Sequence, residues 1–420
     1  MRGPPVMVVM LALACCRGDD AGPRDTGGAE VSDVVLVETA AADTVGISDT
    51  DALILPETDV APEADLTFEV AEETTHDTAS EVEVTPTCAE RPITFPTPTE
   101  PHPWNRLDSE SITELGLANH RGQDVVVQVG NPQVLVAKFA YAFVDKDMLC
   151  EDVDVWVQRE APCGAWEWLG SARTSDNPDD SLDCVNHGTM YEAEDDGGRV
   201  YFEVPDAQAL PIGRHPVRMV LRGDLSLASF DLIVIAPGTQ AVLTDIDGTL
   251  TTADTELTTE MVLAMFDETY QQEMYPDANT VMQAWHDKGY LVVYMSGRPG
   301  FLRRMTERWL EPRFPPGPLH GTDSIWQTRP NIDNTGVFKR DYIDALQAQG
   351  VDFVAAYGNA DTDIWAYSEA GIPKDILYII GPLAGQEGTV ALTGGYPAHL
   401  PFVRAFAEAT IKAPPAFGWW

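Results

Sequence analysis

The chain has 420 residues, with 67 acidic and 26 basic side chains and a formal net charge of −41. Its hydrophobic share of 44 % is typical of a folded protein, so disorder of the whole chain is excluded, and its length allows two or three domains. The acidic excess also argues against nucleic-acid binding, because proteins hold phosphate backbones with basic surfaces.

Residues 1–16 have the pattern of an export signal. Arg2 precedes an apolar run over residues 6–14, which is too short to cross a bilayer and ends in small residues before Cys15 and Cys16. Both cysteines lie in stretches that resemble a bacterial lipoprotein processing box, and an ordinary secretory signal is the alternative. We therefore expect an exported protein of the cell envelope, periplasmic or at the cell surface, anchored to the membrane by a lipid on one of these cysteines.

An acidic linker is predicted for residues 17–87. Residues 17–86 hold 19 acidic and two basic side chains, and the first lysine of the chain is Lys138. Like charges repel, and the segment has too little apolar surface to offset the entropy of ordering, so we expect it to be disordered.

Four cysteines follow the signal segment: Cys88, Cys150, Cys163 and Cys184. An even number in an exported chain indicates two disulfides with three pairings open. A zinc site is the weaker reading, because no Cys-x-x-Cys spacing is present.

Residues 88–237 are predicted to be all-β. Seven segments alternate or cluster β-branched and aromatic residues, with turn residues between them, which is typical of an immunoglobulin-like sandwich. The segments are 124–129, 133–144, 152–158, 165–169, 199–204, 217–222 and 227–235.

Residues 238–420 alternate strands with helices. Short apolar strands over 241–245, 291–295, 353–357 and 376–380 are separated by helical candidates over 259–288, 300–310, 338–349, 362–370 and 399–411. This order predicts an α/β fold, a Rossmann-like doubly wound parallel sheet with its site at the carboxyl ends of the strands.

The first strand of this sheet leads into Asp245-Ile246-Asp247-Gly248-Thr249. This pattern resembles the haloacid-dehalogenase superfamily. The resemblance implies that Asp245 attacks phosphorus to form an aspartyl-phosphate and that Asp247 transfers the leaving-group proton, while Thr249 steadies the second carboxylate.

Later motifs follow in the order that this superfamily has. Ser296, in Ser296-Gly297-Arg298, fits the hydroxyl that binds phosphoryl oxygens, and Gly297 and Arg298, together with Thr249, are expected to bind substrate. Lys339 fits the cation of the site, with Arg340 as its rival. Mg²⁺ is expected on Asp245, the carbonyl of Asp247 and an acid after the third strand, either Asp361 or Asp363.

Residues 242–382 are also similar to the catalytic domain of lipins, the Mg²⁺-dependent phosphatidate phosphatases, and to the related domain of phosphatidylinositol transfer proteins. The similarity rests on the stretches 243–251, 289–298, 338–339 and 353–373. In this pattern the metal-binding acid falls four residues after the Asn of Gly-Asn, which selects Asp363.

The combined reading is a Mg²⁺-dependent phosphatase, a phosphoric monoester hydrolase that acts on phosphatidate or a related phospholipid at the membrane. Only 49 positions separate Asp247 from Ser296, and 43 separate Ser296 from Lys339, so no cap domain covers the site. An open site suits a large or membrane-embedded substrate. Two alternatives stay open: a phosphatase for soluble or protein-bound phosphomonoesters, and a non-catalytic phospholipid-binding module. We expect a monomer.

Overall fold

The structure is a computed structural model that describes residues 94–142, 145–177, 184–185, 187, 189–190, 193–252, 272–324 and 327–416, all of which belong to one compact unit. The predicted export signal with Cys15 and Cys16, the predicted linker 17–87 and Cys88 lie outside the described residues.

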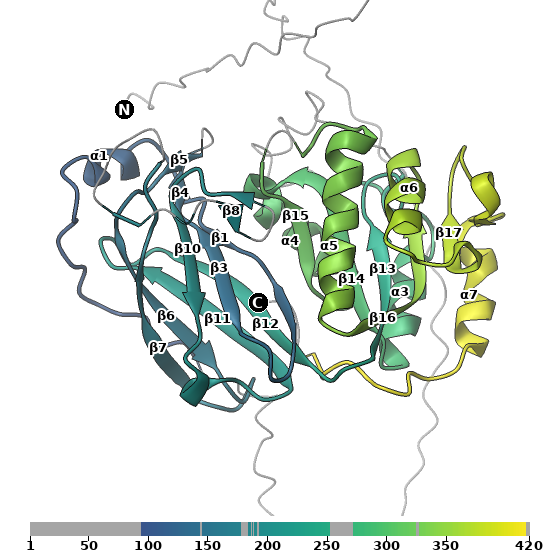
Figure 1. The fold of residues 1–420 in the computed structure, drawn as a ribbon, viewed down its shortest axis with the longest axis horizontal. Coiled ribbons are helices and arrows are strands. Elements are labelled where there is room, and N and C mark those ends of the chain that lie inside the picture. Colours follow the sequence, from purple (N-terminus) through teal and green to yellow (C-terminus); the bar gives the residue numbers. More distant parts are fainter. Residues whose placement is uncertain are drawn as a thin grey trace, which may run out of the picture. The chain divides into compact units, whose positions relative to one another are not determined.

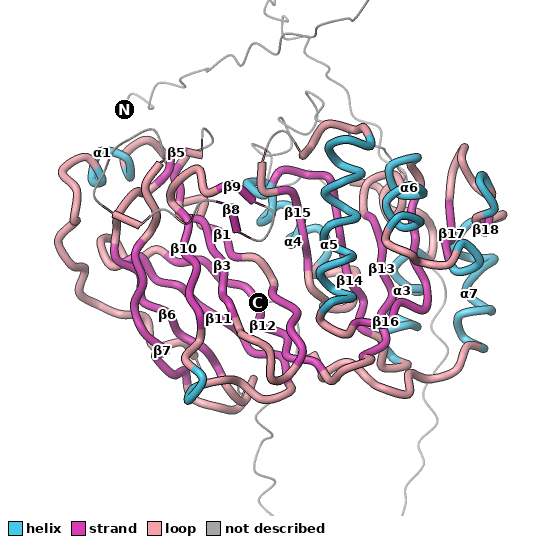
Figure 2. The backbone as a smooth tube through the Cα atoms, in the orientation of Figure 1, coloured by secondary structure: helices cyan, strands magenta, loops and turns pink. Residues whose placement is uncertain are grey.

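Two β-sheets form the first half of the described chain, where Figure 2 shows magenta strands joined by loops, with little helix. The three-stranded sheet has the order β1 (Arg121–Gly122), β3 (Val134–Lys138), β10 (Arg199–Glu203). The five-stranded sheet has the order β2 (Val125–Gln128), β12 (Leu227–Ile235), β11 (Gly213–Leu221), β6 (Asp152–Gln158), β7 (Trp166–Arg173). Smaller elements are α1 (Ser109–Thr113), β4 (Ala140–Tyr141), β5 (Lys146–Asp147), β8 (Thr189–Met190), β9 (Ala193–Glu194) and η2 (Asp206–Gln208).

Alternating sequence explains how these sheets pack. In β6, Val153, Val155 and Val157 are fully buried, whereas the residues between them are half-buried, because successive side chains of a strand point to opposite faces. The buried valines join residues of the three-stranded sheet, such as Leu135 and Val200, in one core. The predicted β-sandwich is therefore confirmed.

All seven predicted strands of the sandwich are present, and β6 and β12 have the predicted bounds. The strand predicted over 133–144 is wrong in its second half. It ends at Lys138, because Ala140 and Tyr141 leave β10 and pair with β5 instead.

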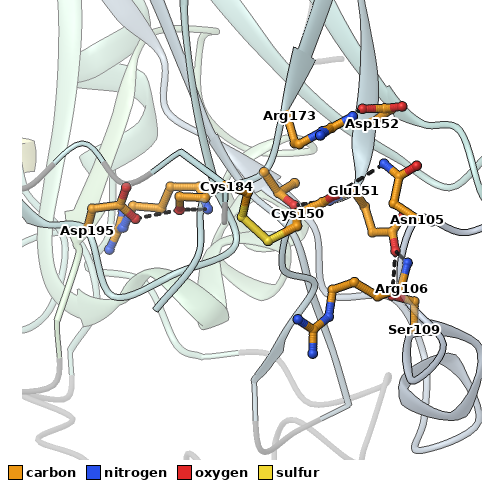
Figure 3. Close-up of a disulfide and its surroundings, with 12 residues drawn as sticks. Asn105, Arg106, Ser109, Cys150, Glu151, Asp152, Arg173, Cys184 and Asp195 are labelled. Carbon is orange, nitrogen blue, oxygen red and sulfur yellow. Dashed lines mark hydrogen bonds and ion pairs between the residues drawn. A yellow bond between two sulfur atoms is a disulfide. The ribbon is translucent and has the colours of Figure 1, made fainter. Parts of the chain in front are cut away.

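One disulfide lies at the end of the sandwich that carries α1 (Figure 3). It joins Cys150 to Cys184, with 5.8 Å between the Cα atoms. The next residue, Glu151, is buried, and its carboxylate accepts hydrogen bonds from the backbone N–H of Asn105 and of Arg106 and from Ser109 Oγ. The disulfide and this buried carboxylate together fix the chain that leads into α1. Cys163 lies on the surface.

The second half of the described chain is built on a six-stranded sheet in which every pair is parallel. Its order is β15 (Leu319–Thr322), β14 (Leu291–Pro299), β13 (Thr239–Asp245), β16 (Val351–Gly358), β17 (Leu377–Ile379), β18 (Val390–Ala391). The chain builds outward from β13 first through β14 to β15, then returns to β16 on the other side. This is a doubly wound order with its switch point at the end of β13.

Helices cover both faces of this sheet, as the predicted α/β fold requires. Alternate residues of β13 point to opposite faces: Val242 packs with α3 (Ala278–Asp287), α4 (Arg303–Leu310) and α7 (Gly395–Ala405), whereas Leu243 packs with α5 (Val337–Ala348) and α6 (Asp361–Glu369). Figure 1 shows α5 lying across the sheet. Shorter turns are η3 (Gly300–Leu302), the π-helix η4 (Ile332–Gly336), η5 (Lys374–Ile376) and η6 (Gln386–Gly388).

Most predicted helices agree with the structure, but two differ. The helix predicted over 259–288 is described only from residue 272 onward, and there α3 starts at Ala278. The last helix begins four residues earlier than predicted, at Gly395, and ends at Ala405. Pro401 lies inside it, where it removes one backbone hydrogen bond without stopping the helix.

The sandwich and the α/β part share a buried boundary. Val126, Ile233 and Ile235 of the sandwich belong to the same hydrophobic cluster as α5 and one face of the parallel sheet. Arg303 at the start of α4 forms a buried ion pair with Asp124 of the sandwich at 2.7 Å. The three-stranded sheet lies beside the region that follows β14, because Arg199 of β10 contacts Asp323 just after β15.

Candidate functional site

The candidate site lies at the carboxyl ends of three neighbouring strands. β13 ends at Asp245, β14 carries Ser296 and Arg298 near its end, and β16 ends at Gly358 immediately before α6. Because parallel strands end at the same edge of the sheet, residues separated by more than a hundred positions meet here.

Lys339, on α5, forms the centre of the first cluster. Its ammonium group lies 2.7 Å from Asp245 Oδ1 and 2.6 Å from Asp363 Oδ1, and all three side chains are buried. The two carboxylates raise the pKa of Lys339 above its ordinary value, although burial acts in the opposite direction. The sequence left Arg340 as a rival for this position. Arg340 instead pairs with Asp341 and Asp344 and is one-third exposed.

Asp363 is fixed by the start of α6. Its Oδ2 atom accepts hydrogen bonds from the backbone N–H groups of Asn359 at 2.9 Å and Ala360 at 3.0 Å. This arrangement requires glycine at position 358, since an added Cβ would lie 2.6 Å from the Cβ of Asp363. The Gly-Asn dipeptide therefore serves to bring the helix start against the strand end.

Asp245 is buried between charged and polar neighbours. Its pKa is raised to about 7, mainly by burial; the carboxylates of Asp363 and Asp247 act in the same direction, and Lys339 acts against them. Thr249 Oγ1 donates to Asp245 Oδ2 at 3.1 Å and also lies 3.1 Å from Asn359 Oδ1. Thr249 thus contacts the first carboxylate of the motif, rather than the second as predicted.

Asp247 belongs to a second cluster with Ser296 and Arg298. The guanidinium of Arg298 contacts both carboxylate oxygens of Asp247, at 2.6 and 2.8 Å, and Ser296 Oγ donates to Asp247 Oδ2 at 3.0 Å. Arg298 also donates to Thr306 and Gln272. The carboxylate expected to move a proton is therefore occupied by protein partners.

The structure brings together every site residue that the sequence analysis selected beyond the signal segment. They form two adjoining clusters, one around Lys339 and one around Arg298, with Gly297 between Ser296 and Arg298 in β14. Three further residues that contact the clusters were not predicted: Asn359, Thr306 and Tyr396. The hydroxyl of Tyr396 donates to the carbonyl of Thr249. Only Asn359 had a signal, its place in the Gly-Asn dipeptide; the other two depend on tertiary packing.

The oxygen atoms around Asp245 are of the chemical type that binds Mg²⁺. Oxygen atoms are the ligands this ion prefers, and two buried carboxylates against one ammonium leave an excess negative charge that a cation would balance. Within the described ranges, no three Asp, Glu, His or Cys side chains are grouped so as to hold a metal ion by themselves. The expected set has only two carboxylates and a backbone carbonyl, and Mg²⁺ stays a prediction.

Comparison with protein families identifies both parts of the described chain. Residues 242–381 match the LNS2 domain of the PITM 1-3 proteins, and residues 118–181 and 185–234 match their β-sandwich domain. The chain therefore combines a PITM-type β-sandwich domain with a lipin-type LNS2 domain, and the latter is the α/β part that holds both clusters.

Curated relatives agree with this assignment. The chain is 31 % identical over 293 residues to protein retinal degeneration B of Drosophila melanogaster, which covers 69 % of this chain and 20 % of that protein. It is 30 % identical to the human membrane-associated phosphatidylinositol transfer protein 1 over 74 % of this chain and 22 % of that protein. It is 28 % identical to the mouse membrane-associated phosphatidylinositol transfer protein 3, over 74 % of this chain and 28 % of that protein. The chain thus spans about a quarter or less of the length of most of these relatives.

Two predictions are corrected by these relatives. The expected phosphoric monoester hydrolase is wrong, because the mammalian relatives are named as phosphatidylinositol transfer proteins, which are lipid carriers. The motif residues are nevertheless retained, and their carboxylates form ion pairs with Lys339 and Arg298.

The expected exported, lipid-anchored bacterial protein is also wrong, because the relatives are animal proteins, and the mammalian ones are named as membrane-associated. A short apolar run next to cysteines was the whole basis of that prediction, and it lies outside the described residues. Within the described parts of the chain, no helix is both long and apolar enough to cross a membrane.

Proposed function

We propose that the chain is a phospholipid-binding module whose LNS2 domain recognises the phosphorylated headgroup of an anionic lipid, of the phosphatidate class, at a membrane surface. The observation that carries this proposal is the convergence of the Asp245 loop, Ser296 and Lys339 at one sheet edge, in a domain matched to lipid carriers. These are groups that hold phosphoryl oxygens in the lipin-type pattern, and in a carrier they would bind the phosphate without cleaving it.

Mg²⁺ is part of this proposal. Asp245, Asp363 and the carbonyl of Asp247 would hold the ion, and its charge would let a site with excess carboxylate accept a phosphate dianion. Ser296 would donate to a phosphate oxygen once the headgroup competes for Asp247's partners.

The charge of the protein makes the test specific. A chain with a net charge of −41 is repelled by anionic vesicles, so binding to them cannot come from general electrostatic attraction. Vesicles of phosphatidylcholine alone, with phosphatidylserine and with phosphatidate separate membrane affinity, negative charge and the exposed phosphomonoester. We expect sedimentation with the phosphatidate vesicles only, and less of it after chelation of Mg²⁺.

A matched pair of serine variants tests the site. Ser296→Ala removes the hydroxyl beside Asp247, and we expect about three- to tenfold weaker binding, the usual range for one lost hydrogen bond. Ser368→Ala removes a hydroxyl that bonds only to the Ile364 carbonyl within α6, so its binding should equal that of the wild type. Equal binding to all three vesicles, or multiple-turnover phosphate release from phosphatidate, would contradict the proposal.

A further inference from the structure

Three cations lie side by side on the three-stranded sheet of the sandwich. In the register of this sheet, Lys138 on β3 is directly opposite Arg121 on β1 and directly opposite Arg199 on β10. Residues directly opposite one another point to the same face, so the three side chains form a row across the sheet, which we call the cationic row.

Such a row is unfavourable by itself, because like charges placed directly opposite destabilise a sheet. Carboxylates compensate it: Arg121 pairs with Asp145 at 2.7 Å, and Lys138 pairs with Asp196 at 2.8 Å and Asp147 at 3.2 Å. All three cations are largely buried, with side-chain exposures of 4 to 12 %. Arg199 pairs with Asp196 at 3.3 Å and with Asp323 at 3.6 Å, so each cation of the row has carboxylate partners that balance its charge.

The cationic row forms one wall of a cavity, and the LNS2 domain forms the other. Ser296, Arg298 and Arg303 line the LNS2 side, so five cationic side chains surround this space and Asp323 is its one acidic lining residue. Asp145, Asp147 and Asp196 do not line it. An arginine has five N–H donors and a lysine has three. The ion pairs with these carboxylates therefore use only some of the hydrogen-bond donors of the cationic row, and the others can bind a ligand.

The cavity adjoins the candidate site through shared residues. Ser296 and Arg298 line it, and both also bind Asp247. A ligand in the cavity therefore contacts the same two side chains that the LNS2 motif places at the end of β14.

We propose that this cavity is the second half of the headgroup site, in which the cationic row binds the phosphate of an anionic phospholipid opposite Ser296 and Arg298. The sandwich is then part of the ligand site rather than a neighbouring support. This inference rests on the proposed function for the nature of the ligand, and it adds the residues of a second domain to the site.

The test uses the full chain with phosphatidate vesicles and, in parallel, with inorganic phosphate. Arg121→Gln and Arg199→Gln each remove one cation of the row, and we expect each to weaken vesicle binding about tenfold or more, as for a lost charge-assisted hydrogen bond. The control is Arg173→Gln, which removes an arginine from the exposed end of β7, where it pairs with Asp152 outside the cavity. Its binding should stay within twofold of the wild type.

Conservative variants guard against loss of folding. Lys138→Arg and Arg121→Lys keep the charge and the compensating carboxylates, so they should keep most of the binding while thermal unfolding confirms a native fold. If the wild type does not bind phosphatidate vesicles, the proposed function fails. If the wild type binds and the folded Arg121→Gln and Arg199→Gln variants bind equally well, this inference is overturned. Loss of inorganic phosphate binding with unchanged vesicle binding would overturn the lipid assignment of the cavity.

Discussion

The two folded parts of the chain bury charge in different ways. In the LNS2 domain, Asp245, Asp363 and Lys339 converge from β13, α6 and α5 on one point of the sheet edge. In the sandwich, charged side chains pair at several places along the strands, such as Arg214 with Asp231 and Lys138 with Asp147. Convergence is what a parallel sheet allows, because all of its strands end at one edge. The strands of the sandwich pair mainly antiparallel, apart from β2 with β12, so they do not all end at one edge, and the cationic row arises instead from strand register.

Because of this difference, we expect the largest loss of stability from a substitution at Lys339. Lys339→Met leaves two buried carboxylates without their cation, and loss of one partner from a buried pair costs about 3–5 kcal/mol of the free energy of unfolding. Urea denaturation of the wild type and of Lys339→Met measures this loss in the free energy of unfolding. The control is Lys374→Met, which breaks an exposed pair with Glu387 and should cost less than about 1 kcal/mol. Similar losses in the two variants would mean that the cluster around Lys339 contributes no special stability.

The sandwich should depend more on its disulfide than on any single ion pair. Replacing Cys150 and Cys184 together by Ala opens a loop with a sequence separation of 34, and chain entropy predicts a loss of about 3–4 kcal/mol. Because the bond lies in the sandwich, unfolding followed by tryptophan fluorescence should shift while the LNS2 clusters keep their geometry. A reducing agent should destabilise the wild type and leave the double variant unchanged, and an equal response of both would contradict this assignment.

His120 gives the sandwich a pH dependence of its own. Its Nδ1 accepts from the Ala140 N–H at 3.2 Å and its Nε2 lies 2.7 Å from Ser226 Oγ, and burial lowers its pKa from 6.5 to about 3. Below pH 6.5 the unfolded chain therefore gains a proton that the folded chain does not. The stability present above pH 6.5 should fall by about 1.4 kcal/mol per pH unit as the pH drops toward 3.

The variant His120→Gln isolates this effect, because it lacks the titrating group. It should be less stable than the wild type at pH 7 and should lose less stability between pH 6.5 and 4.5, as measured by urea denaturation at each pH. Parallel pH profiles for the two proteins would show that His120 does not carry the dependence.

The sequence predicts local features in both parts of the chain, but it does not predict contacts that depend on tertiary structure. Alternation in Asp152–Gln158 and Leu227–Ile235 located two strands to the residue, and the Asp245 motif located the sheet edge, because both signals are local. The cationic row was not predicted, since it depends on the register between β3 and a strand of only two residues. The ion pair of Asp247 with Arg298 was missed for the same reason: it joins a side chain of the turn after β13 to a side chain of β14, and no local pattern encodes that distance.

The smallest effect on stability and binding is expected at Arg340, the residue next to Lys339. Lys339 and Arg340 are neighbours in sequence, yet α5 turns Lys339 into the sheet edge and places Arg340 at the surface beside Asp341 and Asp344. Arg340→Met should therefore cost less than about 1 kcal/mol in the free energy of unfolding and leave binding to phosphatidate vesicles unchanged. A binding loss in folded Arg340→Met protein would mean that the headgroup reaches the outer face of α5, because Arg340 contacts neither carboxylate of the Lys339 cluster. In that case the position of a residue around α5 would not decide whether it belongs to the binding site, because both Lys339 and Arg340 would contribute to binding.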